Sequence, residues 1–402
     1  MRLGLPILTA ALLLPTAAMA QNGGQLVWPA PPEPARIQFL GEFHSEKDLG
    51  RKEGLFSRLR RSLSGAGPEA SIRVQRPFDV YTRDGNTLLF SDGASGVVEF
   101  DRRTKKARLL GQDVPGGLVR PLGMGGDGQG RVYIADPGAA RVVVLGPTGS
   151  YERAFGGREI LYNPVDVAVD PGTERIYVVD AYLHQVVIFD RSGAVTGRLG
   201  KATRSVAERP IRILATEPHG GASPPAAPTQ ANGEADPAIV SQHQSAGVSL
   251  SEPRDLWENR GGGDGEFRYP SSIAVGPDGR VYVVDQMNFR VQVFDRTGRF
   301  VRQIGQLGDQ PGAFARPKGV AVDGDGHLYV SDAAFNNIQV FDADGRLLLS
   351  FGGLGHGPGQ HWMPLGLCVD GTNRIYVADR YNNRAAIYQY LGVPASTPGA
   401  DR

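Results

Sequence analysis

Short runs of alternating hydrophobic and polar residues fill most of the chain, and clusters of turn-forming residues divide them. In the stretch 271–304, such runs occupy residues 271–276, 280–284, 290–294 and 299–304, and the turns between them contain Pro, Asp, Gly and Asn. Alternation with a period of two predicts half-buried β-strands. Turn signals at intervals of about 8–12 residues predict that these strands form antiparallel sheets.

The same pattern recurs as an internal repeat. A β-rich run that ends in aspartate occurs six times, at Asp92, Asp136, Asp180, Asp285, Asp332 and Asp379. The spacings are 44, 44, 105, 47 and 47 residues, so the long interval equals one repeat plus an insertion of about 60 residues, which we assign to residues 201–266. Six units of four strands predict an all-β fold, the six-bladed β-propeller, in which neighbouring sheets cover each other's faces.

The last unit is one strand short. After its third strand, at residues 384–390, the chain continues into a polar tail that we expect to be flexible at 394–402. A spare strand pattern, ARIQFLGEF, lies at residues 35–43. We expect this N-terminal strand to complete the last blade, because the pairing removes an exposed sheet edge. The propeller would then span residues 35–393, preceded by a linker at 21–34.

Two repeats carry a more specific signature. Residues 269–305 and 316–352 keep the order Pro, Asp-Gly, Val-Tyr-Val-x-Asp and Val-Gln-Val-Phe, or close variants of it. This order resembles the NHL-repeat family of six-bladed propellers, and the resemblance covers about 290 of the 402 residues. It implies the propeller fold. It does not imply one function, because the family includes lyases, RNA-binding proteins and interaction modules.

The N-terminus has the features of a bacterial export signal. Arg2 precedes an apolar run, Leu3–Leu14, and Ala18-Met19-Ala20 places small residues where a signal peptidase reads them. We therefore predict a signal peptide at residues 1–20 with cleavage before Gln21, and a periplasmic or secreted protein. A retained membrane anchor is the alternative, which the short apolar run disfavours.

Charge and cysteine content narrow the choice of function. The chain has 43 basic and 42 acidic residues, and removal of Arg2 with the leader leaves 42 of each. Nucleic-acid binding is not expected, because it needs a basic excess to displace the counterions of phosphates. The single cysteine excludes an intrachain disulfide and cysteine-based zinc sites. We expect a monomer.

Loops between units and turns after each second strand should share one face of the propeller, because successive strands alternate in direction. The insertion at 201–266 and the segment 44–71 fall on this face. Within residues 51–63, Leu55, Phe56 and Leu59 follow helical spacing among several basic residues. Two interpretations remain open, namely a helix docked on the propeller, or a helix that contacts a membrane surface or an acidic partner.

The turn tips on this face carry aromatic and other large side chains, which favour contact with a ligand or partner unless something else covers them. The alternative is that the insertion and the predicted helix cover them. The candidate binding residues are Tyr182, His184, Met287, Phe289, Phe335, Trp362, Arg380 and Tyr381.

The six repeated aspartates are expected to be structural. Six equivalent carboxylates suggest six equivalent turns, whereas one active site needs asymmetry. We expect each to accept backbone N–H bonds within its turn. Arg290 and Arg384 follow an aspartate by five residues and are candidates to pair with it.

A zinc enzyme is the main catalytic alternative. The peptide amidating lyase is a six-bladed NHL propeller, and Asp180–Val186 (DAYLHQV) is similar to a stretch of it. That resemblance implies zinc-binding histidines directly after the proline that opens each innermost strand. This sequence has no histidine there, because the positions hold Phe78, Leu122, Val165, Ser271, Lys318 and Leu365.

The central channel offers three further candidates. Asp79 and Asp166 follow an opening proline by two residues and could hold Ca²⁺, or could make hydrogen bonds at the strand edge. Calcium needs six or more oxygens, and two carboxylates are too few. Lys318 is either a lone ammonium at the channel mouth or a solvated charge. We therefore predict neither a metal nor a cofactor.

These observations predict an exported binding or scaffold module that presents its loop-rich face to another exported protein, a peptide or a glycan. The alternative is a metal-dependent lyase or hydrolase with its site at the central channel.

Overall fold

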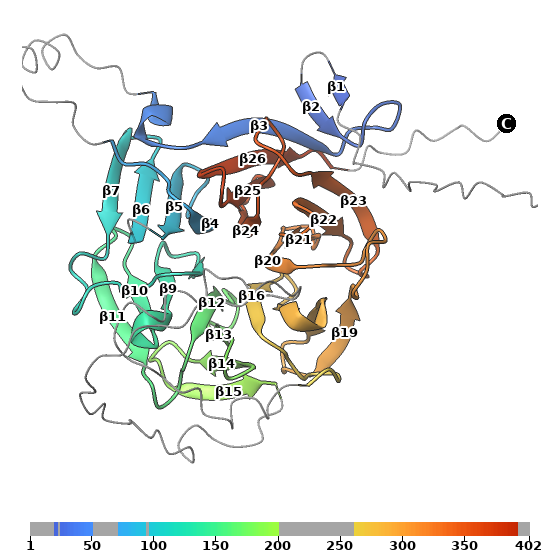
Figure 1. Ribbon diagram of the computed structural model, residues 1–402. Coiled ribbons are helices and arrows are strands. Elements are labelled where there is room, and N and C mark those ends of the chain that lie inside the picture. The colour runs from blue at the N-terminus through green and yellow to red at the C-terminus, as the bar shows by residue number, and fades with distance from the viewer. Residues whose placement is uncertain (1–19, 23–24, 51–70, 94–95, 201–260, 393–402) are drawn as a thin grey trace, which may run out of the picture.

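The structure, a computed structural model, describes residues 20–22, 25–50, 71–93, 96–200 and 261–392. Its strands form six sheets arranged in a ring (Figure 1). Each sheet corresponds to one sequence repeat. The six-bladed propeller is therefore confirmed. Most of the predicted signal peptide, the predicted helix at 51–63, most of the insertion and the polar tail lie outside the described residues.

The first three blades each contain four antiparallel strands, which are numbered from the ring centre outwards. Blade 1 consists of β4 (Pro77–Thr82), β5 (Thr87–Asp92), β6 (Gly96–Asp101) and β7 (Lys106–Leu110). Blade 2 consists of β8 (Met124–Gly126), β9 (Val132–Asp136), β10 (Arg141–Leu145) and β11 (Tyr151–Gly156). Blade 3 consists of β12 (Pro164–Val169), β13 (Ile176–Asp180), β14 (Gln185–Phe189) and β15 (Val195–Leu199).

The last three blades repeat this arrangement, and the final one borrows its outer strand. Blade 4 consists of β16 (Pro270–Val275), β17 (Val281–Asp285), β18 (Arg290–Phe294) and β19 (Phe300–Ile304). Blade 5 consists of β20 (Pro317–Val322), β21 (Leu328–Asp332), β22 (Asn337–Phe341) and β23 (Leu347–Gly352). Blade 6 contains β24 (Pro364–Val369), β25 (Arg374–Asp379), β26 (Arg384–Tyr390) and then β3 (Ile37–Phe43) from the N-terminal side.

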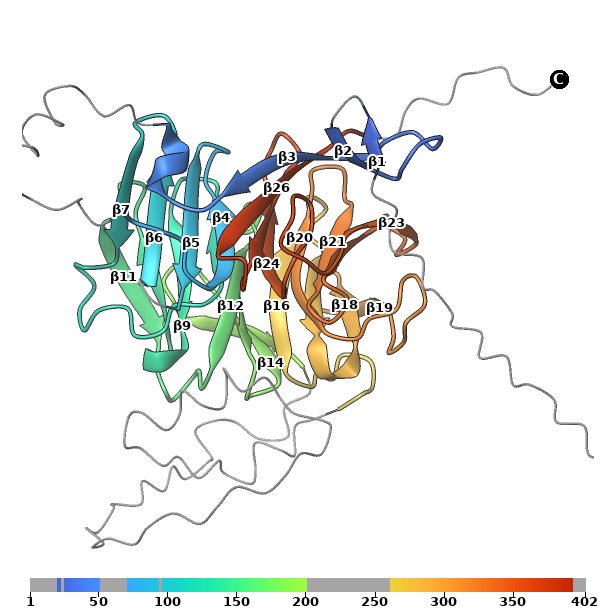
Figure 2. The same ribbon diagram turned by 45° about the horizontal axis from the view of Figure 1, so that its top comes forward.

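The ring closes where β3 lies antiparallel to β26, with Ile37 opposite Tyr390 and Phe43 opposite Ala385 (Figure 2). Two more strands extend this sheet, β2 (Gln25–Trp28) and β1 (Ala20–Asn22). The prediction of a linker at residues 21–34 is therefore wrong. The physical reason is Trp28, which is 1% exposed and packs its ring 5.8 Å from that of Tyr388.

Each pair of neighbouring blades shares a hydrophobic core. Between blades 4 and 5, for example, Val284 and Val291 meet Val320 and Phe341. The second strands are buried at every position in all six blades apart from the first residues of β5 and β25. Both faces of these sheets are apolar, so a single blade could not bury its surface without its neighbours.

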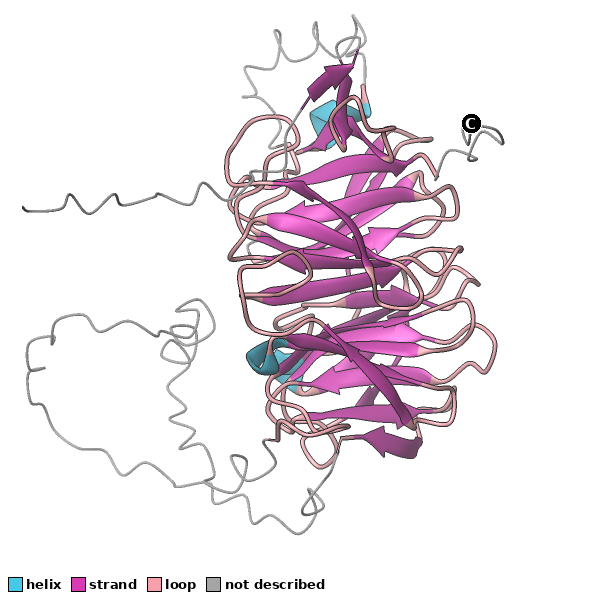
Figure 3. Ribbon diagram, turned by 90° about the vertical axis from the view of Figure 1, so that its right-hand side faces the viewer, coloured by secondary structure: helices cyan, strands magenta, loops and turns pink. Residues whose placement is uncertain are grey.

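The strands run across the ring and leave turns on two faces (Figure 3). We name the upper face as the one that carries the turns after each second strand, such as Ala181–His184, and the segments that lead into each innermost strand. The lower face carries the hairpins between first and second strands and between third and fourth strands. The described residues include three 3₁₀ helices, η1 (Glu46–Leu49), η2 (Pro137–Ala139) and η6 (Gln286–Asn288). No helix in the described ranges is long and apolar enough to cross a membrane.

Candidate binding face

The six repeated aspartates form a buried layer beneath the upper face, since none is more than 3% exposed. Their main partners are backbone N–H groups of the segment that enters the same blade. Asp285 accepts the N–H of Arg268 at 2.7 Å, and Asp379 accepts the N–H of Trp362 at 2.8 Å. The structural role of the aspartates is thus confirmed. The donors expected from the turn itself are joined by donors from the entering segment. Asp332, for instance, also accepts N–H bonds from its own turn, at 2.9 and 3.1 Å.

The sheet register explains this preference for the entering segment. In blade 4 the opening proline, Pro270, lies directly opposite Asp285, and Pro364 lies opposite Asp379 in blade 6. Proline has no N–H of its own. In both blades the N–H group two residues before the proline, that of Arg268 or Trp362, bonds to the aspartate at the end of the second strand.

A second set of acceptors joins one blade to the next. His184, Asn336 and Asn383 each end the turn after a second strand and have left-handed φ angles of 54°, 56° and 52°. Their side chains accept the N–H of the residue before the next opening proline, at 2.9, 2.8 and 2.8 Å, and these donors are Tyr269, Met363 and Arg76. His184 was predicted to bind a ligand. This is wrong, because the side chain is 2% exposed and its Nδ1 holds blade 4 against blade 3.

Where the turn offers no such acceptor, the N–H before the next opening proline bonds to the aspartate of its own blade. Ala140 and Phe289 end their turns in the same left-handed conformation but carry no acceptor atom. In the blades that follow them, Asn163 and Arg316 instead donate their N–H to the aspartate of their own blade, Asp180 and Asp332. One side chain at the end of a turn therefore determines the backbone conformation at the entrance of the next blade.

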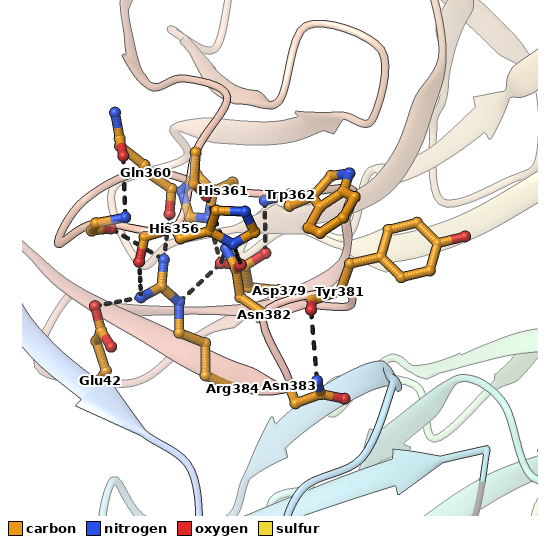
Figure 4. A network of polar contacts seen from close by, with 12 residues as sticks. Glu42, His356, Gln360, His361, Trp362, Asp379, Tyr381, Asn382, Asn383 and Arg384 are labelled. Atoms are coloured by element: carbon orange, nitrogen blue, oxygen red, sulfur yellow. Dashed lines mark hydrogen bonds and ion pairs between the residues drawn. The ribbon is translucent and has the colours of Figure 1, made fainter.

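Two arginines clasp the aspartates, as predicted. Arg290 Nε lies 2.9 Å from Asp285 Oδ2, and its guanidinium also donates to Gln303 Oε1 on the outer strand at 2.8 Å. Arg384 Nε lies 2.8 Å from Asp379 Oδ2. Its outer-strand partner is Glu42 of β3, so in blade 6 the same clasp ties the N-terminal strand to the C-terminal one (Figure 4).

The most exposed candidates lie directly above this clasp. Trp362 is 42% exposed and Tyr381 is 38% exposed, and their ring centres are 5.2 Å apart. His356 packs edge-on against Trp362 at 4.9 Å, and its Nδ1 lies 2.7 Å from Asn382 Oδ1. We call His356, Trp362 and Tyr381 the aromatic cluster. Its backbone is fixed from below, because Trp362 donates to Asp379, and Tyr381 donates to the carbonyl of Trp362 at 3.1 Å.

The remaining candidates do not join it in one exposed surface. Tyr182, Met287, Phe289 and Phe335 are half-buried, and Phe289 packs against the core between blades 4 and 5. Arg380 is only 4% exposed, so its prediction as an exposed contact is wrong. Its guanidinium stacks 4.1 Å above the ring of Phe78, the residue after an opening proline, across the junction of blades 6 and 1.

The carboxylates at the ring centre hold innermost strands together. Each oxygen of Asp79 accepts one backbone N–H, from Val80 at 2.9 Å and from Met124 of the next blade at 2.8 Å. Asp166 bonds in the same way to Val167 at 2.8 Å and to Ile273 of the next blade at 2.9 Å. Asp79 and Asp166 therefore make hydrogen bonds at the strand edges, which was one of the two interpretations of these residues.

Burial changes the acidity of both carboxyls. It raises the pKa of Asp166 to about 6, and burial together with the nearby Asp166 charge raises the pKa of Asp79 well above its usual range. Lys318 is not a lone ammonium, because its Nζ donates to Gln286 Oε1 at 3.1 Å.

Potential metal ligands gather at one place in the described part of the chain, the lower-face hairpin with Asp323, Asp325 and His327. Asp323 Oδ1 accepts the N–H groups of Asp325 and His327 at 3.0 and 2.8 Å. Its Oδ2 lies 2.9 Å from both His327 Nδ1 and the hydroxyl of Tyr329. These bonds explain the cluster as a hydrogen-bonded turn. His361 is fully buried against the hydroxyl of Tyr388, at 2.9 Å.

The comparisons with known proteins agree with this architecture. The family described as a 6-bladed beta-propeller matches residues 263–326, and the NHL repeat matches residues 314–341 and 362–387. The RING finger protein nhl-1 of Caenorhabditis elegans is 43% identical over 56 residues, which make up 14% of this chain and only 6% of that protein.

Solved structures resemble the chain at the level of the fold. A protein of unknown function from Bacteroides thetaiotaomicron VPI-5482 has a TM-score of 0.52 and 17% identity, over 80% of this chain and 71% of its own. A gluconolactonase from Xanthomonas campestris, XC5397, has a TM-score of 0.49 and 13% identity, over 89% of this chain and 98% of its own. Such low identities show the fold alone.

The sheet topology and the family match described as a 6-bladed beta-propeller place the protein among the six-bladed β-propellers. Within that class the chain carries NHL repeats, which confirms the resemblance seen in the sequence.

Proposed function

We propose that the protein is an exported binding or scaffold module that holds a partner on its upper face. The partner would be another exported protein, a peptide or a glycan, in the periplasm or outside the cell, and the module itself would be a monomer. The observation that carries this proposal is the aromatic cluster, in which two large rings are exposed side by side on a buried and fully bonded support.

The energetics of this cluster favour binding. Trp and Tyr are typical anchors of protein interfaces, and truncation of such an anchor commonly costs about 2 kcal/mol or more of binding free energy. A surface that is already ordered loses less entropy when it binds. Here Asp379 accepts bonds from Trp362 and Asn382, at 2.8 and 2.7 Å, so the turn that presents the rings is ordered before any partner arrives.

The test compares two double variants of the full chain. Trp362→Ser with Tyr381→Ser removes the exposed rings, and Leu109→Ser with Val301→Ser removes similarly exposed apolar side chains from the outer strands β7 and β19. An exported partner would be identified by cross-linking to the wild type, purified, and titrated against all three proteins by calorimetry.

We expect the control variant to bind like the wild type and the ring variant to bind at least tenfold more weakly, with unfolding free energies within about 1 kcal/mol of each other. Equal affinity of the two variants for the purified partner would refute the proposal.

The alternative function is a lyase or hydrolase that acts at the ring centre. It would have to use Asp79 and Asp166, whose raised pKa values are of the kind found at catalytic sites. The hydrogen bonds disfavour it, because all four carboxylate oxygens already accept backbone N–H groups. Stoichiometric zinc or calcium in the purified protein, lost in Asp166→Asn, would favour the enzyme over the binding module.

A further inference from the structure

The two ends of the innermost strands differ in charge. We define the inner rim as the two residues before each opening proline, the one after it, and the turn after the second strand of the same blade. Within the described residues the inner rim contains no carboxylate other than the buried aspartates that end the second strands. Its cationic residues are Arg76, Arg120, Arg268, Arg316, Lys318 and Arg380.

The lower ends of the same strands carry both signs of charge, since four of the first hairpins also hold an arginine, such as Arg131, which lies 3.4 Å from Asp127. Each first hairpin contains an aspartate, and these are Asp84, Asp127, Asp170, Asp278, Asp323 and Asp370. They have a local explanation, because each accepts backbone N–H bonds within its own hairpin, for example Asp370 from Thr372 at 2.8 Å. The hairpin aspartates thus shape their own turns.

Arg76, Arg120, Arg268 and Arg316 make no ion pair with a carboxylate in the described part of the chain. Arg76 and Arg268 are exposed, and Arg316 is half-buried. Arg120 donates from one nitrogen to Asn163 Oδ1 at 2.8 Å, while its Nε is buried and has no hydrogen-bond partner among the described atoms. Burial lowers the pKa of Arg120, so its surroundings disfavour the charge that it carries.

The backbone that carries these arginines is held from below. The N–H of Arg120 bonds to Asp136 at 2.8 Å, that of Arg316 to Asp332 at 3.1 Å, and that of Arg76 to Asn383 at 2.8 Å. Three blades thus present a guanidinium at the equivalent position, directly before the opening proline. Guanidinium groups suit carboxylates, because the planar group can donate two parallel hydrogen bonds to one carboxylate.

The chemistry of the rim also selects against other ligands. Its charged groups are donors only, so the ligand must supply acceptors. Neutral sugars have hydroxyl groups that can accept such bonds, but they carry no negative charge to match the guanidinium groups. Polyanions such as nucleic acids bind through a general basic excess, and this chain has a net charge of only +1. Half-buried Met287, Phe335 and Tyr182 lie on the turns of the same rim and suit apolar side chains.

We propose that the inner rim binds an acidic peptide segment of the partner, in which Asp or Glu residues meet Arg76, Arg120 and Arg316. This inference rests on the proposed binding function and specifies its ligand. The aromatic cluster overlaps the inner rim at blade 6, because Trp362 and Tyr381 belong to both, and it would contact apolar residues of the same partner.

Fluorescence anisotropy with short labelled peptides tests this directly on the full chain. The probe is a peptide of Glu, Asp and Leu, and the comparison peptide has Gln and Asn in place of the acids. A single-stranded RNA of equal charge serves as the third probe. We expect the acidic peptide to bind, the neutral one not to bind, and the RNA to bind at least tenfold more weakly.

Two triple variants separate the rim from total charge. Arg76→Ser, Arg120→Ser and Arg316→Ser should weaken binding of the acidic peptide at least tenfold. Arg102→Ser, Arg299→Ser and Arg346→Ser remove the same charge from exposed arginines of lower-face hairpins and should change it less than twofold. Equal loss in both triple variants, tighter binding of the RNA, or no binding of the acidic peptide would overturn the inference. Thermal unfolding of both variants confirms that each is folded.

The same variants distinguish this inference from the proposed function. If the purified partner loses affinity for the Trp362 and Tyr381 variant but not for the rim variant, the upper face is still the binding face. The proposal that the rim binds an acidic peptide segment is then wrong. If the partner loses affinity for neither, the proposed function itself fails.

Discussion

The upper face consists of two layers that come from the same short segments of chain but follow different rules. In the buried layer, every blade has an aspartate at the end of its second strand. In the layer above it, the residue before the opening proline changes from blade to blade, from the exposed Arg76 to the half-buried Tyr269 and the buried Asn163 and Met363. A position that repeats in all six blades serves the fold. A position that differs among equivalent blades is available for recognition, and this difference identified both the aromatic cluster and the inner rim.

The largest effect is expected when the buried layer is broken. Asp379→Ala leaves the guanidinium of Arg384, which is 2% exposed, without its buried partner and removes the acceptor of Trp362. Loss of one member of a buried ion pair costs about 3–5 kcal/mol. We expect a decrease of this size in the free energy of unfolding, measured by guanidinium denaturation. Asp190→Ala, in an exposed hairpin, is the control, and an equal loss there would remove the distinction between the layers.

A second effect depends on pH and arises at the ring centre. The pKa of Asp166 is raised to about 6 in the folded protein, above its value in the unfolded chain, so the folded protein binds the proton more tightly. Stability is therefore greatest below about pH 4 for this group, and on the order of 3 kcal/mol is lost as the pH rises through 6. Asp166→Asn should reduce this dependence in denaturation curves between pH 4 and 7. A variant whose curve runs parallel to that of the wild type would contradict the assignment.

His184 tests the difference between the two layers. It belongs to a turn whose sequence differs from blade to blade, yet its side chain is buried. His184→Leu leaves the N–H of Tyr269 without an acceptor, which costs about 1–3 kcal/mol. His184→Asn should recover most of this stability, because Asn336 and Asn383 do the same work at two other junctions. Thermal denaturation of both variants checks the prediction, and equal destabilisation by Leu and Asn would show that the contact is steric.

The smallest effect is expected at the closing clasp. Glu42→Ala removes the outer-strand partner of Arg384 but leaves the Asp379 pair intact, so a loss of about 1 kcal/mol is expected. Glu42→Gln should be nearly neutral, because Gln303 occupies the matching place beside Arg290 in blade 4. If Gln destabilises as much as Ala, the charge of Glu42 matters and the two clasps are not equivalent.

The fold was largely predictable from the sequence, because the alternating pattern and the repeated aspartates are local signals. The two added strands were missed. β2 has only four residues, QLVW, and the prolines that follow it resemble a linker. Its identity as a strand depends on Trp28 filling space beside Phe351 and Tyr388, far away in the chain.

The candidate site was harder to predict, because its geometry depends on contacts between blades. His184 and Tyr269 are separated by 85 positions in the sequence, so no local pattern shows that one bonds to the other. Arg380 is a charged residue in a turn, which favours exposure, yet its side chain is buried over Phe78 of a different blade. Arg76, Arg120 and Arg316 are visible in the sequence as residues before opening prolines, but that they form no ion pair within the described residues is a property of the assembled ring.

The separation of the two layers can be measured most directly by unfolding two variants in guanidinium under identical conditions. Asp285→Asn removes the negative charge of the buried carboxylate that pairs with Arg290. The triple variant at Arg76, Arg120 and Arg316 removes three positive charges from the rim. We predict that the single change lowers the free energy of unfolding by about 3 kcal/mol and that the triple change lowers it by less than about 1 kcal/mol. A triple variant that is less stable than Asp285→Asn would contradict the account.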